Sequence, residues 1–217
     1  MSIERKEIAA IREDYSKSHL SKADVLSNPL EQFSKWFQEA LTSEVTEPTA
    51  MVLSTVSEKG FPSSRVVLLK DIRKNGLSFF TNYTSKKAKE IIHNPSVSIL
   101  FFWPELQRQI RIEGQVEKLP AADSDEYFAS RPRNSQIGAI ASPQSQEIKD
   151  REVLENQVNI LSEKFKEGQN IPRPNFWGGF LVKPVRYEFW QGRSSRLHDR
   201  IIYEMENNNW IIKRIAP

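Results

Sequence analysis

Apolar and polar residues alternate in short segments over most of the chain after residue 50, a period typical of β-strands with one buried face. The alternation is clearest at Ile110, Ile112 and Val116, which are mostly separated by polar residues. Gly, Pro and Asn residues mark turns between segments, as at 58–62 and 74–76. The segments predicted as strands are 50–57, 63–70, 77–81, 96–103, 107–119, 176–182, 185–191, 201–206 and 210–215.

A few other segments carry apolar residues at helical spacing. Such spacing predicts a short helix over 3–16, and the residues Asn-Pro-Leu-Glu at 28–31 are a capping signal for a second helix. The further segments predicted as helical are 84–92, 123–130, 134–141 and 147–166. Short strands interleaved with a few helices indicate an antiparallel barrel, mainly β with α decoration.

No internal repeat and no Gly/Ser linker interrupts the chain. We therefore expect one domain over 1–217, with an N-terminal helical segment over about 1–45. The run Val66-Val67-Leu68-Leu69 is apolar on both faces of its predicted strand. An antiparallel strand of this kind is buried on both sides, either in a barrel wall or against a second subunit, and we favour the subunit.

The composition is that of a globular protein with a small basic excess. The sequence holds 31 Lys and Arg against 28 Asp and Glu, and the pI is about 9.0. No block of like charge reaches five residues, which argues against a nucleic-acid-binding arm. Cysteine is absent, the N-terminus is charged, and the longest apolar run is 99–103, so we expect a cytoplasmic protein that does not enter a membrane.

Several common sites are excluded by their missing motifs. The sequence contains neither the glycine pattern of a dinucleotide fold, nor a P-loop, nor a nucleophile elbow. His19, His93 and His198 lack partners at metal-ligand spacing, so no metal site is predicted.

The residues 190–200 concentrate Trp, Arg, His and Asp directly after a predicted strand. Arg offers a planar fork of donors, so Arg196 and Arg200 with His198 between them indicate a site for a planar, anionic or carbonyl-rich ligand. A solvated hairpin is the alternative that these residues alone leave open.

Other cationic and hydroxyl side chains stand at predicted strand ends and helix starts. Lys86 and Lys87 fall in the first turn of a helix, where the dipole disfavours cations unless an anion binds there; two solvated lysines would also fit. Together these side chains could form two phosphate pockets beside an apolar cleft. The set is Arg65, Lys70, Lys86, Lys87, Arg131, Ser135, Gln144 and Ser145.

Five motifs, in order along nearly the whole chain, resemble the pyridoxine/pyridoxamine 5'-phosphate oxidases. The longest are Ser-Arg-Pro-Arg-x-Ser-Gln-Ile-Gly-Ala at 130–139 and Arg-Leu-His-Asp-Arg at 196–200. The others are Arg-Val-Val-Leu-Leu-Lys at 65–70, Phe-Phe-Thr-Asn at 79–82 with Ser-Lys-Lys at 85–87, and Phe-Trp-Gly-Gly-Phe at 176–180. The resemblance implies an FMN-binding split β-barrel that works as a homodimer, with FMN at the subunit interface. It also implies oxidation of pyridoxine or pyridoxamine 5'-phosphate to pyridoxal 5'-phosphate, with O2 as acceptor and H2O2 as product.

The resemblance also implies roles for individual residues. Arg196 and His198 match the catalytic pair over the pyridine ring. The residues that match flavin contacts are Arg65, Val66, Val67, Leu68, Leu69, Lys70, Phe80, Thr81, Lys86, Lys87, Gln109, Gln144, Ser145, Trp190 and Arg200. The residues that match substrate contacts are Arg12, Tyr15, Lys70, Tyr127, Arg131, Ser135, Arg196 and His198.

Two positions depart from the family pattern, and one role stays open. Lys86 stands where relatives more often have Arg, and Phe80 where some have Tyr. His198 can donate to the substrate or take its proton, since an ordinary imidazole populates both forms near neutrality. The rival interpretations are a split-barrel flavin reductase or flavin carrier, and a basic barrel that binds nucleic acid.

Overall fold

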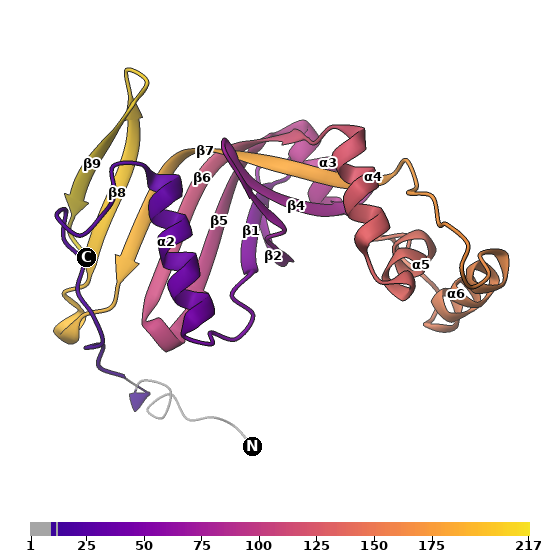
Figure 1. Ribbon diagram of the computed structural model, residues 1–217, viewed down its shortest axis with the longest axis horizontal. Coiled ribbons are helices and arrows are strands. Elements are labelled where there is room, and N and C mark those ends of the chain that lie inside the picture. Colours follow the sequence, from indigo (N-terminus) through magenta and orange to yellow (C-terminus); the bar gives the residue numbers. More distant parts are fainter. Residues whose placement is uncertain (1–9, 12) are drawn as a thin grey trace. The chain divides into compact units, whose positions relative to one another are not determined.

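A computed structural model describes residues 10, 11 and 13–217, in which the sheet is predominantly antiparallel (Figure 1). Strand order among these residues is β2-β1-β5-β6-β7-β4-β3, and β8 pairs with β7 and β9. The strands are β1 Ala50–Val56, β2 Pro62–Leu68, β3 Asp71–Arg73, β4 Gly76–Asn82, β5 Ser96–Trp103, β6 Arg108–Lys118, β7 Trp177–Gln191, β8 Asp199–Glu206 and β9 Asn209–Ile215. The helices are α2 Pro29–Thr42, α3 Lys86–His93, α4 Ala121–Ser130, α5 Arg133–Ala141 and α6 Glu152–Lys164.

The prediction of two strands at 176–182 and 185–191 was wrong, because β7 is continuous through Pro184. Residues up to Val182 pair with β4, and residues from Arg186 pair with β8. Pro184 falls between these two pairings, so its missing N–H costs neither ladder a hydrogen bond. The three-residue β3 was not predicted, because it is too short to show a period.

The predicted helix over 3–16 does not extend to its expected end. Residues 13–16 are not helical, whereas residues 1–9 and 12 lie outside the described residues. The helix expected at 147–166 is shorter, starting at Glu152. None of the described helices is long and apolar enough to cross a membrane.

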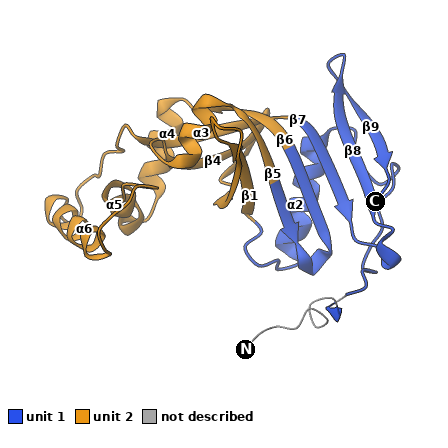
Figure 2. Ribbon diagram, turned by 180° about the vertical axis from the view of Figure 1, so that it is seen from behind, with its two compact units in different colours: residues 1–48, 100–112, 185–217 blue, residues 49–99, 113–184 orange. Residues whose placement is uncertain are grey.

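The chain divides into two compact units that are interleaved along the sequence (Figure 2). Unit 1 comprises 1–48, 100–112 and 185–217, and unit 2 comprises 49–99 and 113–184. Each unit has its own buried aromatic residues. The single domain expected over 1–217 stays a prediction.

In unit 1, the predicted cap of α2 is confirmed, since the Asn28 side chain accepts from the main-chain N–H groups of Leu30 and Glu31. The apolar face of α2 packs through aromatic contacts. Trp36 meets Phe189 edge to face at 5.2 Å between ring centroids. Such contacts between large buried rings fix α2 beside β7.

In unit 2, two successive glycines let β7 pass close to its neighbours. A Cβ at Gly179 would lie 2.5 Å from Leu119 and 2.8 Å from the Phe80 ring. A side chain there would displace Phe80, which lines the cavity described below. The glycines after Trp177 therefore let the β7 backbone come close to Phe80 without displacing its ring from the cavity wall.

The apolar run 66–69, at the end of β2, is not buried on both sides. Leu69, just after the strand, is buried, whereas Val66 is 64% exposed and Leu68 is 39% exposed. Burial of this strand within a barrel wall is therefore wrong for the single chain. The exposed positions are those that we expect a second subunit to cover.

Candidate functional site

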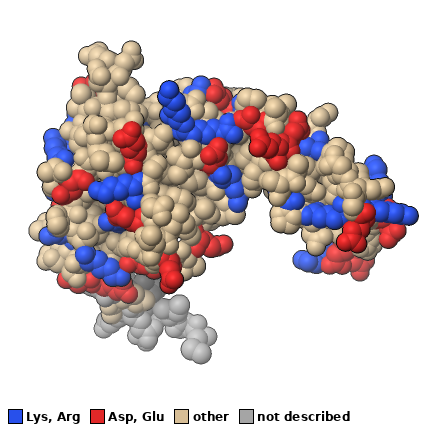
Figure 3. Space-filling view, in the orientation of Figure 1, with Lys and Arg blue, Asp and Glu red and all other residues tan. Residues whose placement is uncertain are grey.

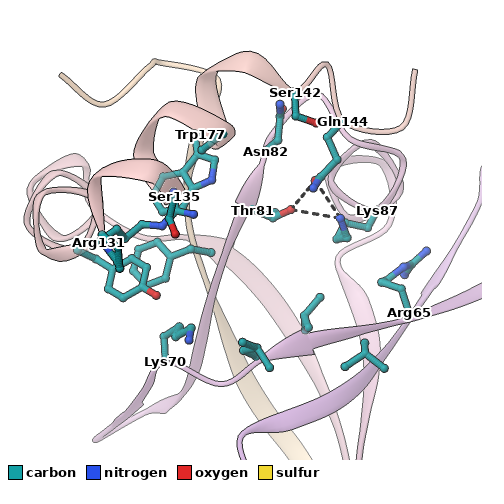
Figure 4. Close-up of a pocket in the computed structure, with 18 of the residues that line it drawn as sticks. Arg65, Lys70, Thr81, Asn82, Lys87, Arg131, Ser135, Ser142, Gln144 and Trp177 are labelled. Carbon is teal, nitrogen blue, oxygen red and sulfur yellow. Dashed lines mark hydrogen bonds between the residues drawn. The ribbon is translucent and has the colours of Figure 1, made fainter. Parts of the chain in front are cut away.

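Unit 2 contains a cavity of about 920 Å³, which is large enough for a cofactor-sized ligand. Figure 4 shows cationic side chains at opposite ends, with Arg65 and Lys87 at one end and Arg131 and Lys70 at the other. The predicted residues that line it are Arg65, Val66, Val67, Leu68, Lys70, Phe80, Thr81, Lys87, Tyr127, Arg131, Ser135 and Gln144. The structure thus gathers twelve predicted side chains from segments far apart in the sequence.

Lys87, on the first turn of α3, is a half-buried cation with neutral partners. Its Nζ donates to Thr81 Oγ1 at 3.2 Å and to Gln144 Oε1 at 3.1 Å. Burial lowers the pKa of Lys87, and the nearby charge of Arg65 lowers it further. Among the described residues no carboxylate pairs with Lys87. Two neighbouring cations of this kind favour binding of an anion at this end.

Arg131, after α4, forms the other cationic end. Its guanidinium lies 4.7 Å from the ring centroid of Trp177, and its Nη1 is buried with no hydrogen-bond partner among the described residues. Burial lowers the pKa of Arg131. An unpartnered buried guanidinium nitrogen is costly unless a ligand accepts from it, so this end also fits an anion.

An aromatic stack lies beside Arg131. Phe80 and Tyr127 are stacked with ring centroids 3.9 Å apart, and Phe80 lies 5.5 Å from Trp177. Trp177 was not predicted as a site residue, although it lies in one of the motifs on which the resemblance rests. Its signal was the bulky indole directly before two glycines. The other unpredicted residues of the cavity include Asn82, Ser130 and Ser142.

A second cavity, of about 590 Å³, lies in unit 1 and contains the predicted catalytic pair. Its lining residues are Ile11, Glu13, Asp14, Tyr15, Arg193, Ser195, Arg196 and His198. The N-terminal segment approaches closely here, because a Cβ at Gly192 would lie 2.5 Å from the Tyr15 ring. Glycine at this position therefore makes room for Tyr15, while Arg12 lies outside the described residues.

The hydrogen bonding of His198 fixes its tautomer. Its Nδ1 lies 3.1 Å from the main-chain nitrogen of Arg193, which can only donate. The neutral ring therefore carries its proton on Nε2. Burial lowers the pKa of His198 below its usual 6.5, and the charge of Arg196 adds to this effect.

Trp190 and Arg200 surround this region without lining the second cavity. The Trp190 ring lies 4.5 Å from the His198 ring. Arg200 donates through Nε to Glu188 at 2.7 Å and through Nη1 to the Ala216 carbonyl at 2.9 Å. Glu188 is only 2% exposed, so its carboxylate anchors the guanidinium.

Four other predicted flavin contacts line neither cavity. Leu69 is buried in the core, and Lys86 is exposed and lies 3.9 Å from Glu90. Gln109 belongs to β6 in unit 1, and Ser145 adopts a left-handed backbone conformation with φ of 69°. Their roles toward flavin stay predictions.

On the face shown in Figure 3, the charged residues do not form a continuous basic strip. Lys and Arg are interspersed there with Asp and Glu. The unit 2 cavity, in contrast, gathers four cationic side chains in its lining. This distribution gives no support to the nucleic-acid interpretation.

Comparison with protein families gives two matches in chain order. Residues 37–163 match the family described as "Pyridoxamine 5'-phosphate oxidase". Residues 177–217 match its "Pyridoxine 5'-phosphate oxidase C-terminal dimerisation region". The two matches together cover most of both units.

A relative from Haemophilus influenzae, named pyridoxine/pyridoxamine 5'-phosphate oxidase, is 51% identical over 97% of this chain and 100% of its own length. Among solved structures, PhzG from Burkholderia lata is 33% identical, with a TM-score of 0.85 over 90% of this chain and 95% of its own. That structure contains tetrahydrophenazine-1-carboxylic acid. A related FMN-binding protein from Nostoc punctiforme is 17% identical, with a TM-score of 0.68 over 85% of this chain and 97% of its own, and this likeness confirms the predicted split-barrel fold class.

Proposed function

The chain belongs to the pyridoxine/pyridoxamine 5'-phosphate oxidase family, and from this premise we propose that it oxidises pyridoxine or pyridoxamine 5'-phosphate to pyridoxal 5'-phosphate. FMN is the cofactor and O2 the electron acceptor, with H2O2 as product and ammonia released from the amine substrate. The observation that carries this function is the unit 2 cavity with a cationic group at each end. FMN and the substrate each bring one phosphate. We place this reaction in the cytoplasm.

The residues of the cavity fit FMN. Its phosphate would be held by Arg65 and Lys87, because Lys87 is a partly desolvated cation with only neutral partners. The exposed apolar residues Val66 and Leu68 would lie along the ring system. When bound, FMN supplies the acceptor for the hydride from substrate C4' and passes the electrons to O2.

The opposite end fits the substrate phosphate. Arg131 would donate its unpartnered Nη1–H to a phosphate oxygen, with Lys70 and Ser135 as further donors from the same cavity wall. The Tyr127 ring is fixed by its stack on Phe80. A phosphate held here orients the pyridine ring without touching its reacting carbon.

Arg196 and His198 would meet the pyridine ring. Because His198 presents Nε2–H, its neutral form donates a hydrogen bond to the substrate and does not take a proton from it. Of the two roles left open by the sequence, this geometry supports the donor. Arg196 would add a fixed positive charge beside the ring.

Oxidation of a phenazine precursor is the second candidate, because the Burkholderia lata structure holds a tetrahydrophenazine carboxylic acid. Anaerobic titration of the yellow holoprotein separates the candidates. Pyridoxine 5'-phosphate should bleach the flavin, whereas unphosphorylated pyridoxine should do so only at much higher concentration. Bleaching by a reduced phenazine carboxylic acid but not by the phosphorylated substrate would support the second candidate. Bleaching only by a nicotinamide nucleotide would instead support a flavin reductase.

The FMN assignment predicts the effect of removing either cation. Arg65→Ala and Lys87→Ala should each weaken FMN binding about tenfold or more, because charge-assisted hydrogen bonds to a dianion are lost. The measurement is the quenching of flavin fluorescence on titration of apoprotein. Lys59→Ala is the matched control, because it removes one positive charge from the exposed turn between β1 and β2, and it should bind FMN normally. Unchanged affinity in both cavity variants would contradict the assignment.

The C-terminal match is to the dimerisation region of the family, and the chain forms a homodimer. We expect FMN at the subunit interface, next to the exposed side of β2. Sedimentation equilibrium should give about twice the chain mass of 25.1 kDa. Val66→Asp should shift the protein toward monomer and release FMN, because it places a charge on the covered face. A flavin-loaded, active monomer would refute this arrangement.

The protonation state of His198 predicts that the activity falls on the acid side of its pH profile, which we call the acid limb. The pKa of His198 is lowered below its usual 6.5, so the ring becomes charged only at a lower pH than an ordinary imidazole does. Protonation places a proton on Nδ1, which then faces the Arg193 N–H and breaks their bond. The rate of flavin reduction at saturating substrate should therefore fall below about pH 6.5. His198→Asn should lack this limb, and an identical limb in that variant would show that another group titrates.

A further inference from the structure

Glu90, on the buried side of α3, is a carboxylate at the centre of a hydrogen-bond network beneath the Arg65 end of the cavity. It is 6% exposed. Its Oε2 accepts from Thr55 Oγ1 at 2.5 Å and from Ser63 Oγ at 2.7 Å, and lies 3.3 Å from Arg65 Nη2. Three elements, β1, β2 and α3, therefore converge on one oxygen atom.

The same two hydroxyls also accept from Arg65. Nη1 donates to Thr55 Oγ1 and Nη2 to Ser63 Oγ, each at 2.6 Å. Nη1 also donates to the Leu53 carbonyl at 3.2 Å. The protein thus engages both terminal nitrogens of the guanidinium.

The carboxylate sets the direction of these bonds. An ionised carboxylate only accepts, so both hydroxyls donate to Glu90 and turn their lone pairs toward Arg65. Burial raises the pKa of Glu90, but the bonds from Thr55 and Ser63 and the charge of Arg65 outweigh burial and lower it overall. The group is therefore ionised at neutral pH, as this bond pattern requires.

We propose that Glu90 is a positioning residue for the FMN phosphate, holding the Arg65 guanidinium so that its free Nε–H and its charge face the cavity. Among the described residues, none accepts a hydrogen bond from Arg65 Nε. This inference rests on the proposed function, in which Arg65 binds that phosphate. Glu90 itself touches no ligand and acts only through Arg65.

Two effects of Glu90 on FMN have opposite signs. Its negative charge repels a phosphate, whereas its hydrogen bonds fix the arginine that attracts one. The carboxylate oxygen already accepts three bonds, and Lys86 Nζ lies 3.9 Å from its other oxygen, so much of its charge is compensated locally. The positioning of Arg65 should therefore outweigh the repulsion of the phosphate, and loss of the carboxylate should weaken FMN binding.

The test compares FMN with riboflavin, which lacks the phosphate, on apoprotein titrated by flavin fluorescence. Glu90→Gln should raise the Kd for FMN roughly tenfold, by loss of charge-assisted bonds, and leave the Kd for riboflavin unchanged. Ser63→Ala removes one of the two hydroxyls that link Glu90 to Arg65, at a less buried position. It should raise the Kd for FMN several-fold and leave the Kd for riboflavin unchanged. Ser54→Ala is the matched control, because its exposed hydroxyl bonds Ser64 in the same strand pair, and it should change neither Kd.

A double variant tests the route of the effect. In the Arg65→Ala background, Glu90→Gln should change FMN affinity by less than about twofold, since the two residues act as a unit. Equal weakening of FMN and riboflavin by Glu90→Gln, or unchanged or tighter FMN binding, would overturn the role of Glu90 alone. Wild-type protein that binds FMN no better than riboflavin would overturn the phosphate site itself, and with it the inference.

Discussion

Replacing Arg131 with alanine should lower kcat/KM for pyridoxamine 5'-phosphate on the order of a hundredfold or more, because the buried phosphate would lose its charged partner. Arg131 is held over Trp177 at 4.7 Å with Nη1 buried and unpartnered, so it is already in place before a ligand arrives. The loss should appear mainly in KM, since the phosphate lies away from the reacting carbon. Steady-state release of H2O2 measures it.

The substrate without phosphate separates recognition from damage to the fold. Unphosphorylated pyridoxamine should react equally slowly with Arg131→Ala and with wild type. Arg151→Ala removes an exposed arginine from the same unit, whose partner is Glu155, and should behave as wild type. If Arg131→Ala lowered the rate for both substrates to the same degree, Arg131 would support the cavity but would not bind the phosphate.

The sequence predicted most elements of the fold, because most strands have one buried face and so show a period. The strand predicted over 50–57 is observed as β1, in which the buried residues Met51, Leu53 and Thr55 alternate with half-buried ones. The prediction of strands failed where the alternation of apolar and polar residues carries no information about strand boundaries. Pro184 suggested a break in β7, but the interruption of its pairing is harmless there because the strand changes partners.

The residues of the candidate site were predicted from their type and from sequence motifs, whereas their hydrogen-bond and ion-pair partners were not predicted. Arg65 could be singled out as a cation beside an apolar strand run and Lys87 as a cation in the first turn of a helix, yet their partners could not be identified from the sequence. Glu90 looked like an ordinary helix residue, and only the packing of α3 on β1 and β2 brings it to Arg65. The same holds for Glu188, whose burial beneath Arg200 depends on β7 and β8 lying side by side.

Lys86 shows that a position in the first turn of a helix does not by itself identify a residue that lines the cavity. Lys86 and Lys87 are adjacent on α3, so their side chains leave the helix about a quarter-turn or more apart. Lys87 enters the cavity, whereas Lys86 is exposed and lies near Glu90, one turn along the same helix. From the sequence both lysines were predicted to contact flavin; of the two, Lys87 lines the cavity, and the role of Lys86 stays a prediction.

Replacing Arg196 and His198 together with alanine should slow reduction of the bound flavin by pyridoxine 5'-phosphate about a hundredfold, the size typical of lost positioning. Both residues line the unit 1 cavity, and neither contributes to the Arg65 and Lys87 end at which FMN phosphate is proposed to bind. The variant should therefore remain yellow and dimeric. Anaerobic stopped-flow absorbance measures the reduction step directly.

The single variants and the oxidative half-reaction complete the test. If the two residues hold the pyridine ring as one unit, the double variant should be little slower than the slower single one. Reoxidation by O2 should stay near the wild-type rate, because no substrate ring is held in that step. His198→Asn keeps a neutral donor side chain and should recover part of the loss seen with alanine, as expected for a donor at Nε2. Wild-type reduction by the double variant would mean that Arg196 and His198 do not act on the substrate. Slowed reoxidation equal to slowed reduction would instead indicate that the flavin environment itself had changed.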